Sequence, residues 1–382
     1  MARKVLNAGP MSNIQTFPYE LSGLSSLIGR VIDIHEWADR ARIPNRKAPG
    51  FLDGQAVERV LGISAKSWDP ELFGRIETIA LVARDALRSA RLAASDVDAV
   101  IVVTCSPYET LLDQDSFRLL RMLGISDAVP PIQLGAGCAG LARAATVAAR
   151  LQASNVLLIT YSLPSCVTGD GRGGVSDHYR QNTVHPLGSS LWASPGIFSD
   201  AAAALVLRRR KEPHGFALYS RDSQTFGDEP GFVDPLIHYL GGGAQCPPQG
   251  TTSAALSCYG MHGEAVKRYY TKGMMLNHRQ LLAARPDYVD VARRIYTHQA
   301  SPALVSSFAK LAELPPEKAP TNSRELGNLV SPCTAKMLHD DLRSGAVKAG
   351  DTVCISVVGA GPERGAFLLP VAVQDVSDQL VA

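Results

Sequence analysis

The distribution of apolar positions along the chain predicts an α/β protein with buried strands. Continuous apolar runs occupy residues 98–104, 155–161 and 351–358, and runs of this kind are typical of strands that are covered on both faces. Helical spacing alternates with these runs, most clearly over 76–90, and it also predicts helices at 115–123, 266–284, 302–311 and 330–342. Alternating strands and helices favour a layered α/β architecture with parallel strands.

A glycine-rich turn surrounds Cys138. Residues 133–140 read Gln-Leu-Gly-Ala-Gly-Cys-Ala-Gly, and a helical pattern of mainly Ala, Val and Leu follows to about residue 153. Glycines let the backbone turn sharply and approach a ligand closely. Because the helix begins near Cys138, its amides and dipole are expected to favour the thiolate, although a buried, inert cysteine is the alternative. A helix that is apolar on all sides is expected to be buried between layers.

The two halves of the chain share one plan. A strand ending near Cys105, a helix and the turn at Cys138 are followed by a helix and a strand. A strand ending near His298, a helix and a turn at Asn328 are again followed by a helix and a strand. This repeat favours a duplicated unit and predicts an N-terminal half over 1–210 and a C-terminal half over 211–382. Both halves place polar residues where strands meet helices, which is the edge where α/β sheets bind ligands.

Composition narrows the function classes. The 382 residues carry a net charge of only +2 and no long basic run, so neither nucleic acid nor a membrane surface is expected as a partner. No apolar window is long enough to span a membrane, and no signal peptide is predicted. The seven cysteines are dispersed without a Cys-x-x-Cys pair, which favours reduced thiols in the cytoplasm and no metal site. No cofactor is expected, since the glycines at 135–140 lack the dinucleotide-binding pattern.

Several short motifs together resemble the ketoacyl synthase III group of the thiolase superfamily. They are Gly-Ala-Gly-Cys-Ala-Gly at 135–140, Ser-Asp-Ala-Ala-Ala-Ala at 199–204, Thr-His-Gln-Ala at 297–300, Gly-Asn at 327–328, and Gly-Ala-Gly at 359–361 with Gly-Ala at 365–366. They follow the family's order over roughly residues 75–370. The resemblance implies a thiolase-like, five-layered αβαβα fold built from two similar halves, and a homodimer.

The resemblance also implies roles for individual residues. Cys138 would be the nucleophile that takes an acyl group from a thioester, and the backbone amides of Cys138 and Ala360 would form an oxyanion hole. His298 and Asn328 would hold the extender and stabilise its enolate. The chemistry is reasonable, because a thiolate is both nucleophile and leaving group, and a neutral imidazole and an amide are hydrogen-bond donors. Taken singly, His298 is better interpreted as a structural histidine and Asn328 as a helix N-cap, and only the set of Cys138, His298 and Asn328 in this order favours the catalytic interpretation.

The sequence also departs from the family. Residues 69–75 after Trp68 replace an Arg-Thr-Gly-Ile-Arg-like segment that contributes to the acyl-donor entrance in relatives. Residues 108–114 replace a small Pro-Ser stretch near the dimer partner. Glu109 in this stretch is a candidate general base at the dimer loop, with a solvated surface glutamate as the alternative. Irregular segments at 162–197 and 224–262 are expected to cap an unusual acyl pocket. These differences predict a specialised-metabolism, polyketide-type member.

The function expected from these features is acyl transfer of the β-ketoacyl synthase type. Cys138 would be loaded from a thioester of acyl carrier protein or coenzyme A, and a Claisen condensation with a malonyl- or β-ketoacyl thioester would follow. The alternative is a Cys-dependent acyltransferase that forms an ester or amide with an alcohol or amine, with His298 as general base. A non-catalytic partner subunit and a chalcone-type iterative synthase are further alternatives, although the former usually lacks the nucleophile.

Overall fold

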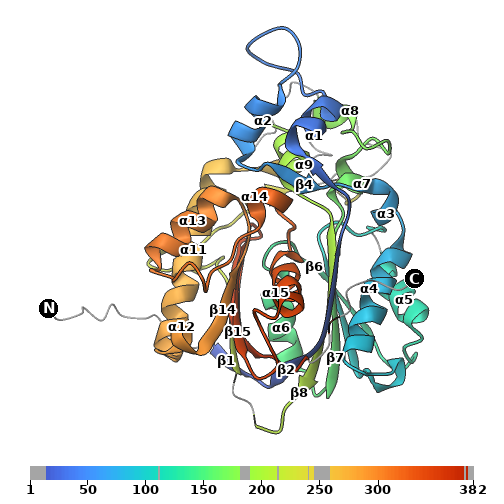
Figure 1. Ribbon diagram of the computed structural model, residues 1–382, viewed down its shortest axis with the longest axis vertical. Helices are drawn as coiled ribbons and strands as arrows, with labels where there is room; N and C mark the ends of the chain where they lie inside the picture. The colour runs from blue at the N-terminus through green and yellow to red at the C-terminus, as the bar shows by residue number, and fades with distance from the viewer. Residues whose placement is uncertain are drawn as a thin grey trace, which may run out of the picture.

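The computed structural model describes residues 14–110, 112–180, 190–212, 215–239, 241–244, 259–373 and 376. Two five-stranded sheets face each other across a pair of helices (Figure 1). Cys246 and Cys258, like parts of the irregular segments 162–197 and 224–262, lie outside the described residues.

The first sheet belongs to the N-terminal half and has the strand order β2-β8-β7-β5-β6. β5 pairs in parallel with β6 and β7, whereas β8 is antiparallel to both β7 and β2. All six residues of β5 are buried, as expected for a strand covered on both faces. The strands are β2 (Tyr19–Ile28), β5 (Ala99–Thr104), β6 (Pro131–Gly135), β7 (Asn155–Ser162) and β8 (Ala201–Arg209).

The second sheet repeats this plan with the order β1-β9-β16-β15-β14. β14 and β15 are parallel, and β16 and β9 follow as antiparallel neighbours. The boundary at residue 210 falls between β8 and β9, and hence between the sheets, whereas β1 from the start of the chain completes the second sheet. The strands are β1 (Ile14–Phe17), β9 (Gly215–Arg221), β14 (Ala292–Thr297), β15 (Thr352–Gly359) and β16 (Glu363–Pro370).

Helices form the other three layers (Figure 1). α4 (Ile76–Ser89) and α5 (Gln114–Leu123) cover the outer face of the first sheet. α11 (Gly263–Ala284), α12 (Tyr288–Val291) and α13 (Pro302–Leu311) cover the outer face of the second sheet. α6 (Gly140–Arg150) and α15 (Cys333–Ser344) lie between the sheets, within the largest apolar core. The predicted five-layered αβαβα fold of two similar halves is therefore confirmed.

Glycines on the second sheet allow α6 to pack closely against it. A Cβ atom added to Gly359 would lie 2.8 Å from the backbone nitrogen of Ala139, and one added to Gly365 would lie 2.8 Å from Cβ of Ala142. Real Cβ atoms do not approach so closely, so these positions need glycine. The prediction of a buried helix after Cys138 is confirmed, and its small side chains explain how it fits between two sheets.

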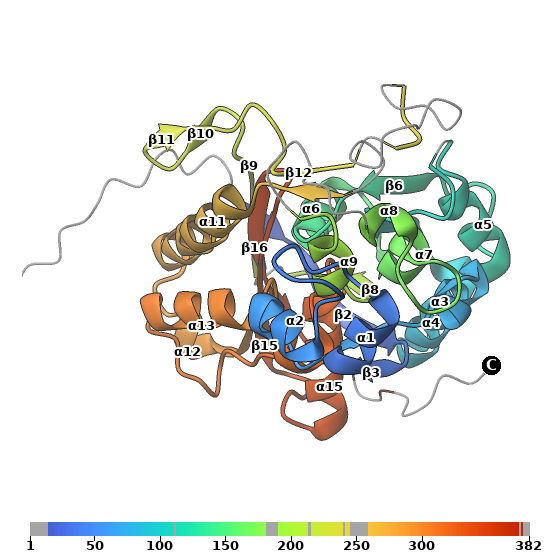
Figure 2. The ribbon, with the colours of Figure 1, turned by 90° about the horizontal axis from the view of Figure 1, so that it is seen from above.

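A small cap of short elements lies above the sheets (Figure 2). Trp37 and Trp68 pack edge to face at its centre, and the buried ammonium of Lys66 lies 4.9 and 4.4 Å from their ring centroids. Lys66 also donates to the carbonyls of Pro195 and Gly196, which joins two parts of the cap that are distant in sequence. The cap consists of β3 (Val31–Asp33), α1 (Ile34–Ala41), α2 (Gly54–Leu61), β4 (Ala65–Ser67), α8 (Asp177–Arg180) and α9 (Ala193–Ile197).

The remaining elements are short connectors. They are α3 (Pro70–Phe73), η2 (Ala94–Asp96), α7 (Pro164–Thr168), β10 (Thr225–Phe226), β11 (Glu229–Pro230), β12 (Ile237–His238), β13 (Gly260–Met261) and α14 (Ser323–Leu326). Within the described part of the chain, no helix is both long and apolar enough to cross a bilayer.

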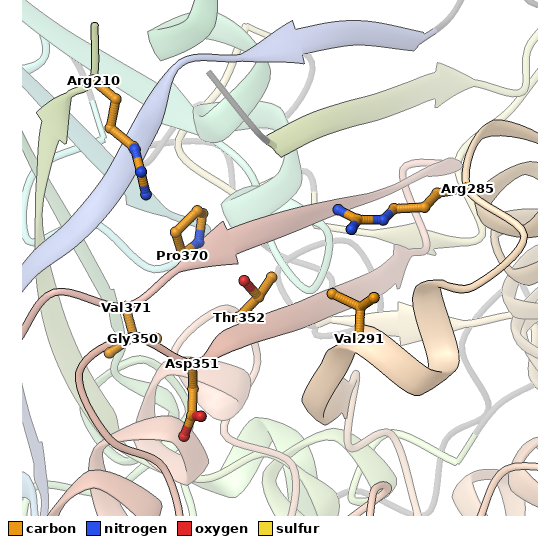
Figure 3. Close-up of a pocket in the computed structure, with 8 residues that line it drawn as sticks. All are labelled: Arg210, Arg285, Val291, Gly350, Asp351, Thr352, Pro370 and Val371. Carbon is orange, nitrogen blue, oxygen red and sulfur yellow. The ribbon is translucent and has the colours of Figure 1, made fainter. Parts of the chain in front are cut away.

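A hollow of about 320 Å³ lies where β15 begins (Figure 3). Arg210 and Arg285 line it, but each already pairs with a carboxylate, Glu20 at 3.4 Å and Asp287 at 3.2 Å. Its lining includes no thiol, histidine or hydroxyl-bearing side chain other than Thr352. This hollow therefore offers no nucleophile for acyl transfer, and the chemistry is found at the other end of β15.

Candidate active site

A second cavity, of about 230 Å³, opens between the two halves at the end of β15. Cys138 and Ala360 both line it, as predicted for a nucleophile and an oxyanion hole that share one site. Its apolar wall includes Phe198, Tyr259 and Val330, so an acyl group can lose contact with water there. The described parts of both irregular segments contribute to the lining, with residues 162, 164, 167, 168, 237, 239 and 259.

Cys138 lies in the turn between β6 and α6. Gly140 makes the turn possible, because an added Cβ there would lie 2.3 Å from a methyl group of Val103. The thiol is half-buried, and burial raises its pKa well above the ordinary value, with Cys105 and Cys333 adding to the rise. The local backbone donor lowers this pKa, as expected for the start of a helix, but burial outweighs it and the thiol stays protonated in the free chain.

This thiol state leads to a testable pH dependence. The rate of alkylation of Cys138 by iodoacetamide is expected to rise about tenfold per pH unit from pH 6 to 8.5 without levelling off, because only the thiolate reacts. Intact-protein mass spectrometry at timed intervals measures this rate, with a small free thiol of pKa near 8.5 as reference. A rate that is already constant below pH 7 would contradict it.

Asn328 contacts the nucleophile directly. Its side-chain amide acts on the Cys138 thiol and lowers the pKa of that group, while its Oδ1 accepts from the backbone N–H of Val330 at 2.8 Å. The backbone of Asn328 pairs with the segment around Phe198 in an isolated parallel bridge. Asn328 is therefore not a helix N-cap: α15 begins only at Cys333, later than the predicted start at residue 330.

Val330 explains why the helix starts late. It has φ of +58°, a left-handed conformation that a β-branched residue rarely adopts. The hydrogen bond from its N–H to Asn328 helps to hold it there, with its side chain in the cavity lining. Such backbone strain is typical of functional sites.

His298 follows the end of β14 and is almost fully buried. Its backbone is fixed from two sides, because its N–H donates to the carbonyl of Ser356 at 3.0 Å and its carbonyl accepts from Tyr270 Oη at 2.7 Å. Burial lowers the pKa of His298 to about 3, so the imidazole is neutral at physiological pH. Its Nδ1 lies 3.4 Å from Sγ of Cys333.

The turn after β15 brings Ala360 to the cavity. Gly359 packs directly against Ala139, the neighbour of Cys138, at a distance that excludes any side chain. The turn of the second half therefore contacts the turn that carries the nucleophile. This contact is consistent with backbone amides of Cys138 and Ala360 acting together on one acyl carbonyl.

Gly359→Ala is expected to slow acyl loading at Cys138 at least about tenfold and to destabilise the fold by about 1–3 kcal/mol, because the new methyl group must displace the Cys138 turn. Loading measured by mass spectrometry and urea unfolding test both effects. Gly263→Ala is the matched control, since a Cβ at that position meets nothing within 4 Å. Equal behaviour of the two variants would show that the turn tolerates the methyl group.

Glu109 does not reach the cavity within its own chain. Its carboxylate pairs with Arg118, and the side chain is 40% exposed. The structure thus places it on the surface, as in the solvated alternative.

Sequence reasoning missed three features of the site. Cys105 lines the cavity beside Cys138, and it follows β5 just as Cys138 follows β6, so the common sheet edge was an available signal. Arg143 and Glu363 form a two-point ion pair at the cavity wall, 2.7 and 2.6 Å, that joins α6 to β16. Cys333 was noted only as one of seven dispersed thiols. Among the described residues, no group of three or more His, Cys, Asp or Glu is placed to hold a metal ion.

The three residues to which the resemblance assigned acyl transfer, Cys138, His298 and Asn328, thus lie on turns and strand ends of the two facing sheets. Residues 288–371 match the family model of the 3-oxoacyl-[acyl-carrier-protein (ACP)] synthase III C-terminal part. The beta-ketoacyl-[acyl-carrier-protein] synthase III of Rhodopirellula baltica is 25% identical over 301 residues, which cover 74% of this chain and 80% of the relative.

Solved structures share the fold over nearly the whole chain. FabH, a 3-oxoacyl-(acyl carrier protein) synthase III from Pseudomonas aeruginosa, superposes with a TM-score of 0.70 at 21% identity and covers 94% of this chain and 99% of its own. The priming beta-ketosynthase of a polyketide biosynthetic pathway superposes with a TM-score of 0.69 at 19% identity, and the match covers 96% of this chain and 99% of the other. The chain is thus similar in sequence to beta-ketoacyl-[acyl-carrier-protein] synthases III and shares the fold of the solved ones.

Proposed function

We propose that the protein is a condensing enzyme that forms a carbon–carbon bond between an acyl group on Cys138 and a malonyl- or β-ketoacyl thioester. The observation that carries the proposal is the arrangement around Cys138, with the amide of Asn328 on its sulfur and the neutral His298 nearby. The relatives named beta-ketoacyl-[acyl-carrier-protein] synthase III support this reaction class.

The reaction proceeds in two stages. The Cys138 thiolate attacks the carbonyl of an acyl thioester, the tetrahedral oxyanion is held by backbone amides, and the carrier thiol leaves with a proton. A malonyl thioester as extender then loses CO₂, and the bonding electrons pass to its thioester carbonyl oxygen as an enolate. Hydrogen bonds from His298 and Asn328 stabilise that charge, worth on the order of 3 kcal/mol each. The enolate carbon attacks the acyl carbonyl, and Cys138 leaves as the thiolate.

The state of His298 favours condensation over simple acyl transfer to an alcohol or amine. A general base works best when its pKa lies near the working pH, and burial places the pKa of His298 at about 3. A neutral imidazole of this kind is a poor base but a good hydrogen-bond donor. The Cys-dependent acyltransferase alternative would require an imidazole that takes up a proton readily.

The cavity size bears on the substrate. At about 230 Å³ it lies below the range of about 300–1,000 Å³ that is usual for whole-ligand pockets, so it fits the reacting end of a thioester and a short acyl group. We propose acyl carrier protein or coenzyme A as the carrier, and fatty-acid or polyketide-type specialised metabolism as the setting.

We also propose that the protein acts as a homodimer in the cytoplasm. Two large apolar side chains, Leu112 and Phe117, are 80% and 56% exposed beside the Glu109 loop, and a second subunit would cover them. Light scattering on the purified protein tests the assembly state.

Product analysis tests the proposed reaction. Protein preloaded at Cys138 with a short acyl group is mixed with malonyl-acyl carrier protein or malonyl-coenzyme A labelled in the free carboxyl group. Condensation releases labelled CO₂ and gives a β-ketoacyl thioester by mass. An ester or amide product without CO₂ release would identify the acyltransferase instead, and no product with either carrier would reject the proposed reaction.

A further inference from the structure

Cys333 is a buried thiol beside the active site to which the proposed reaction assigns no role. It is the first residue of α15 and has no exposed surface. Its Sγ lies 3.4 Å from Nδ1 of His298, within the ordinary range for a hydrogen bond to sulfur. The two residues belong to different elements of the C-terminal half, so the contact fixes the ring relative to the helix.

The surroundings of the sulfur determine the direction of this hydrogen bond. The backbone N–H groups of Gln299 and Thr334 act on this thiol and lower its pKa, although burial outweighs them. A thiol sulfur is a weak acceptor, and these N–H groups compete with the imidazole for it. The thiol hydrogen is then available to Nδ1, which accepts it.

Both partners are neutral at working pH. Burial raises the pKa of Cys333 to about 12, so the sulfur keeps its hydrogen. Burial lowers the pKa of His298 to about 3, so the ring carries a single hydrogen. A thiolate–imidazolium pair is therefore disfavoured. The single ring hydrogen of His298 then lies on either Nδ1 or Nε2, and the hydrogen bond with Cys333 selects between the two.

We propose that Cys333 is a positioning residue that holds His298 in the Nε2–H tautomer by donating its thiol hydrogen to Nδ1. This inference rests on the proposed function, because the Nε2–H group is the donor that the enolate oxygen requires. The opposite tautomer would present a bare Nε2, which accepts a proton and does not stabilise an oxyanion. Cys333 thereby selects condensation over general-base chemistry.

Nitrogen NMR measures the tautomer directly. Protein labelled with ¹⁵N-histidine shows which ring nitrogen of His298 carries hydrogen, and the resonance is assigned by its loss in His298→Gln. The expected result is a protonated Nε2 in the wild type and in Cys333→Ser, whose hydroxyl can still donate. Cys333→Ala should lose this preference. Cys354→Ala is the matched control, since Cys354 is equally buried on β15 and no hydrogen bond joins it to His298.

Kinetics provide the second measurement. Loading of Cys138 should change less than about twofold in Cys333→Ala, whereas CO₂ release from the extender should fall at least about tenfold and recover in Cys333→Ser, because a wrong tautomer specifically removes the donor. A wild type with hydrogen on Nδ1, or a Cys333→Ala variant with an unchanged tautomer, would overturn the proposal. If Cys333 controls the tautomer but no extender is ever decarboxylated, the proposed function fails and the positioning role stands.

Discussion

Cys138→Ala is expected to abolish acyl loading and to lower condensation on the order of 10³-fold or more. The reason is that the thiol lines the cavity and is held by the amide of Asn328, so no other group occupies the position of the nucleophile. Removing one half-buried sulfur leaves the packing of α6 on both sheets in place, and the variant should remain folded. Intact-protein mass spectrometry after incubation with a panel of acyl thioesters measures loading.

Cys105→Ala distinguishes between the two thiols of the cavity. Cys105 also lines it, but burial raises the pKa of its thiol to about 11 and no side-chain amide is shown at its sulfur. Loading at Cys138 should persist in this variant. An adduct mapped to Cys105 in the wild type, or turnover retained by Cys138→Ala, would disprove the assignment of the nucleophile.

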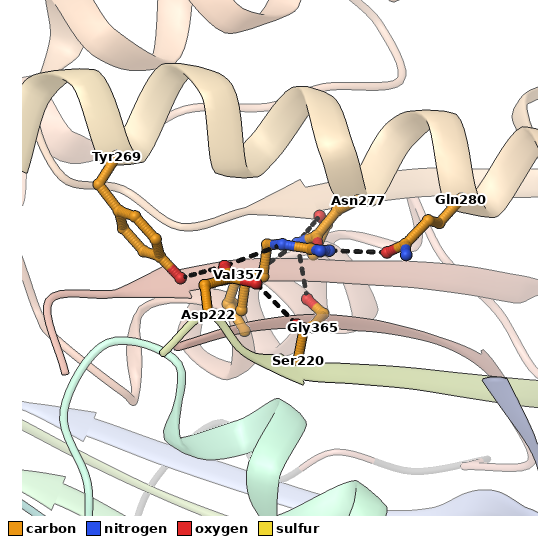
Figure 4. A network of polar contacts seen from close by, with 9 residues as sticks. Ser220, Asp222, Tyr269, Asn277, Gln280, Val357 and Gly365 are labelled. Carbon is orange, nitrogen blue, oxygen red and sulfur yellow. Dashed lines mark hydrogen bonds and ion pairs between the residues drawn. The ribbon is translucent and has the colours of Figure 1, made fainter. Parts of the chain in front are cut away.

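Arg364→Met is expected to destabilise the fold by about 3–5 kcal/mol, the largest stability effect predicted here. The guanidinium is almost fully buried and donates from Nε to Oδ2 of Asp222 at 3.0 Å (Figure 4). It also donates to Asn277 at 3.1 Å and to Gln280 at 2.6 Å, which connects β16 to α11. Without it, the Asp222 carboxylate remains buried and uncompensated. The free energy of unfolding in urea measures the loss.

Two further variants make this prediction specific. Lys267→Met removes an exposed ion pair with Glu264 on the same helix and should cost less than about 1 kcal/mol. The double variant Asp222→Asn with Arg364→Met should regain part of the loss, because the unpaired charge is then absent. A single Arg364→Met variant as stable as Lys267→Met would show that the network adds nothing.

The apolar pattern predicted the centre of the fold well and its beginning poorly. The run at 98–104 and the helix at 76–90 appear as β5 and α4, because their burial follows from their own side chains. β2 gave no clear signal, since its buried face includes Ser22, Ser25 and Ser26, which a pattern of apolar residues does not detect. β2 is buried because it pairs with β8, which is distant from it in the sequence.

The candidate site, too, combines features that the sequence predicted with features that depend on distant contacts. The resemblance implied that Cys138 and Ala360 share one site, and both line one cavity. The late start of α15 and the surface position of Glu109 depend on contacts with Phe198 and Arg118, which no local spacing records. The protonation state of Cys138 depends on burial by residues of the other half, such as Val330, and only the assembled fold reveals it.

The close packing of Gly359 and Gly365 against α6 limits how this duplicated architecture can diverge. The nucleophile comes from one copy of the unit and His298 and Asn328 from the other, so neither copy holds a complete set of reacting groups. Since the contact leaves no room for a single methyl group, a larger residue on one side requires a compensating change on the other. β1 adds a strand from the first copy to the sheet of the second. Substitutions at this contact must therefore occur in both copies together. The substrate range can change more easily through substitutions in the loops that line the cavity.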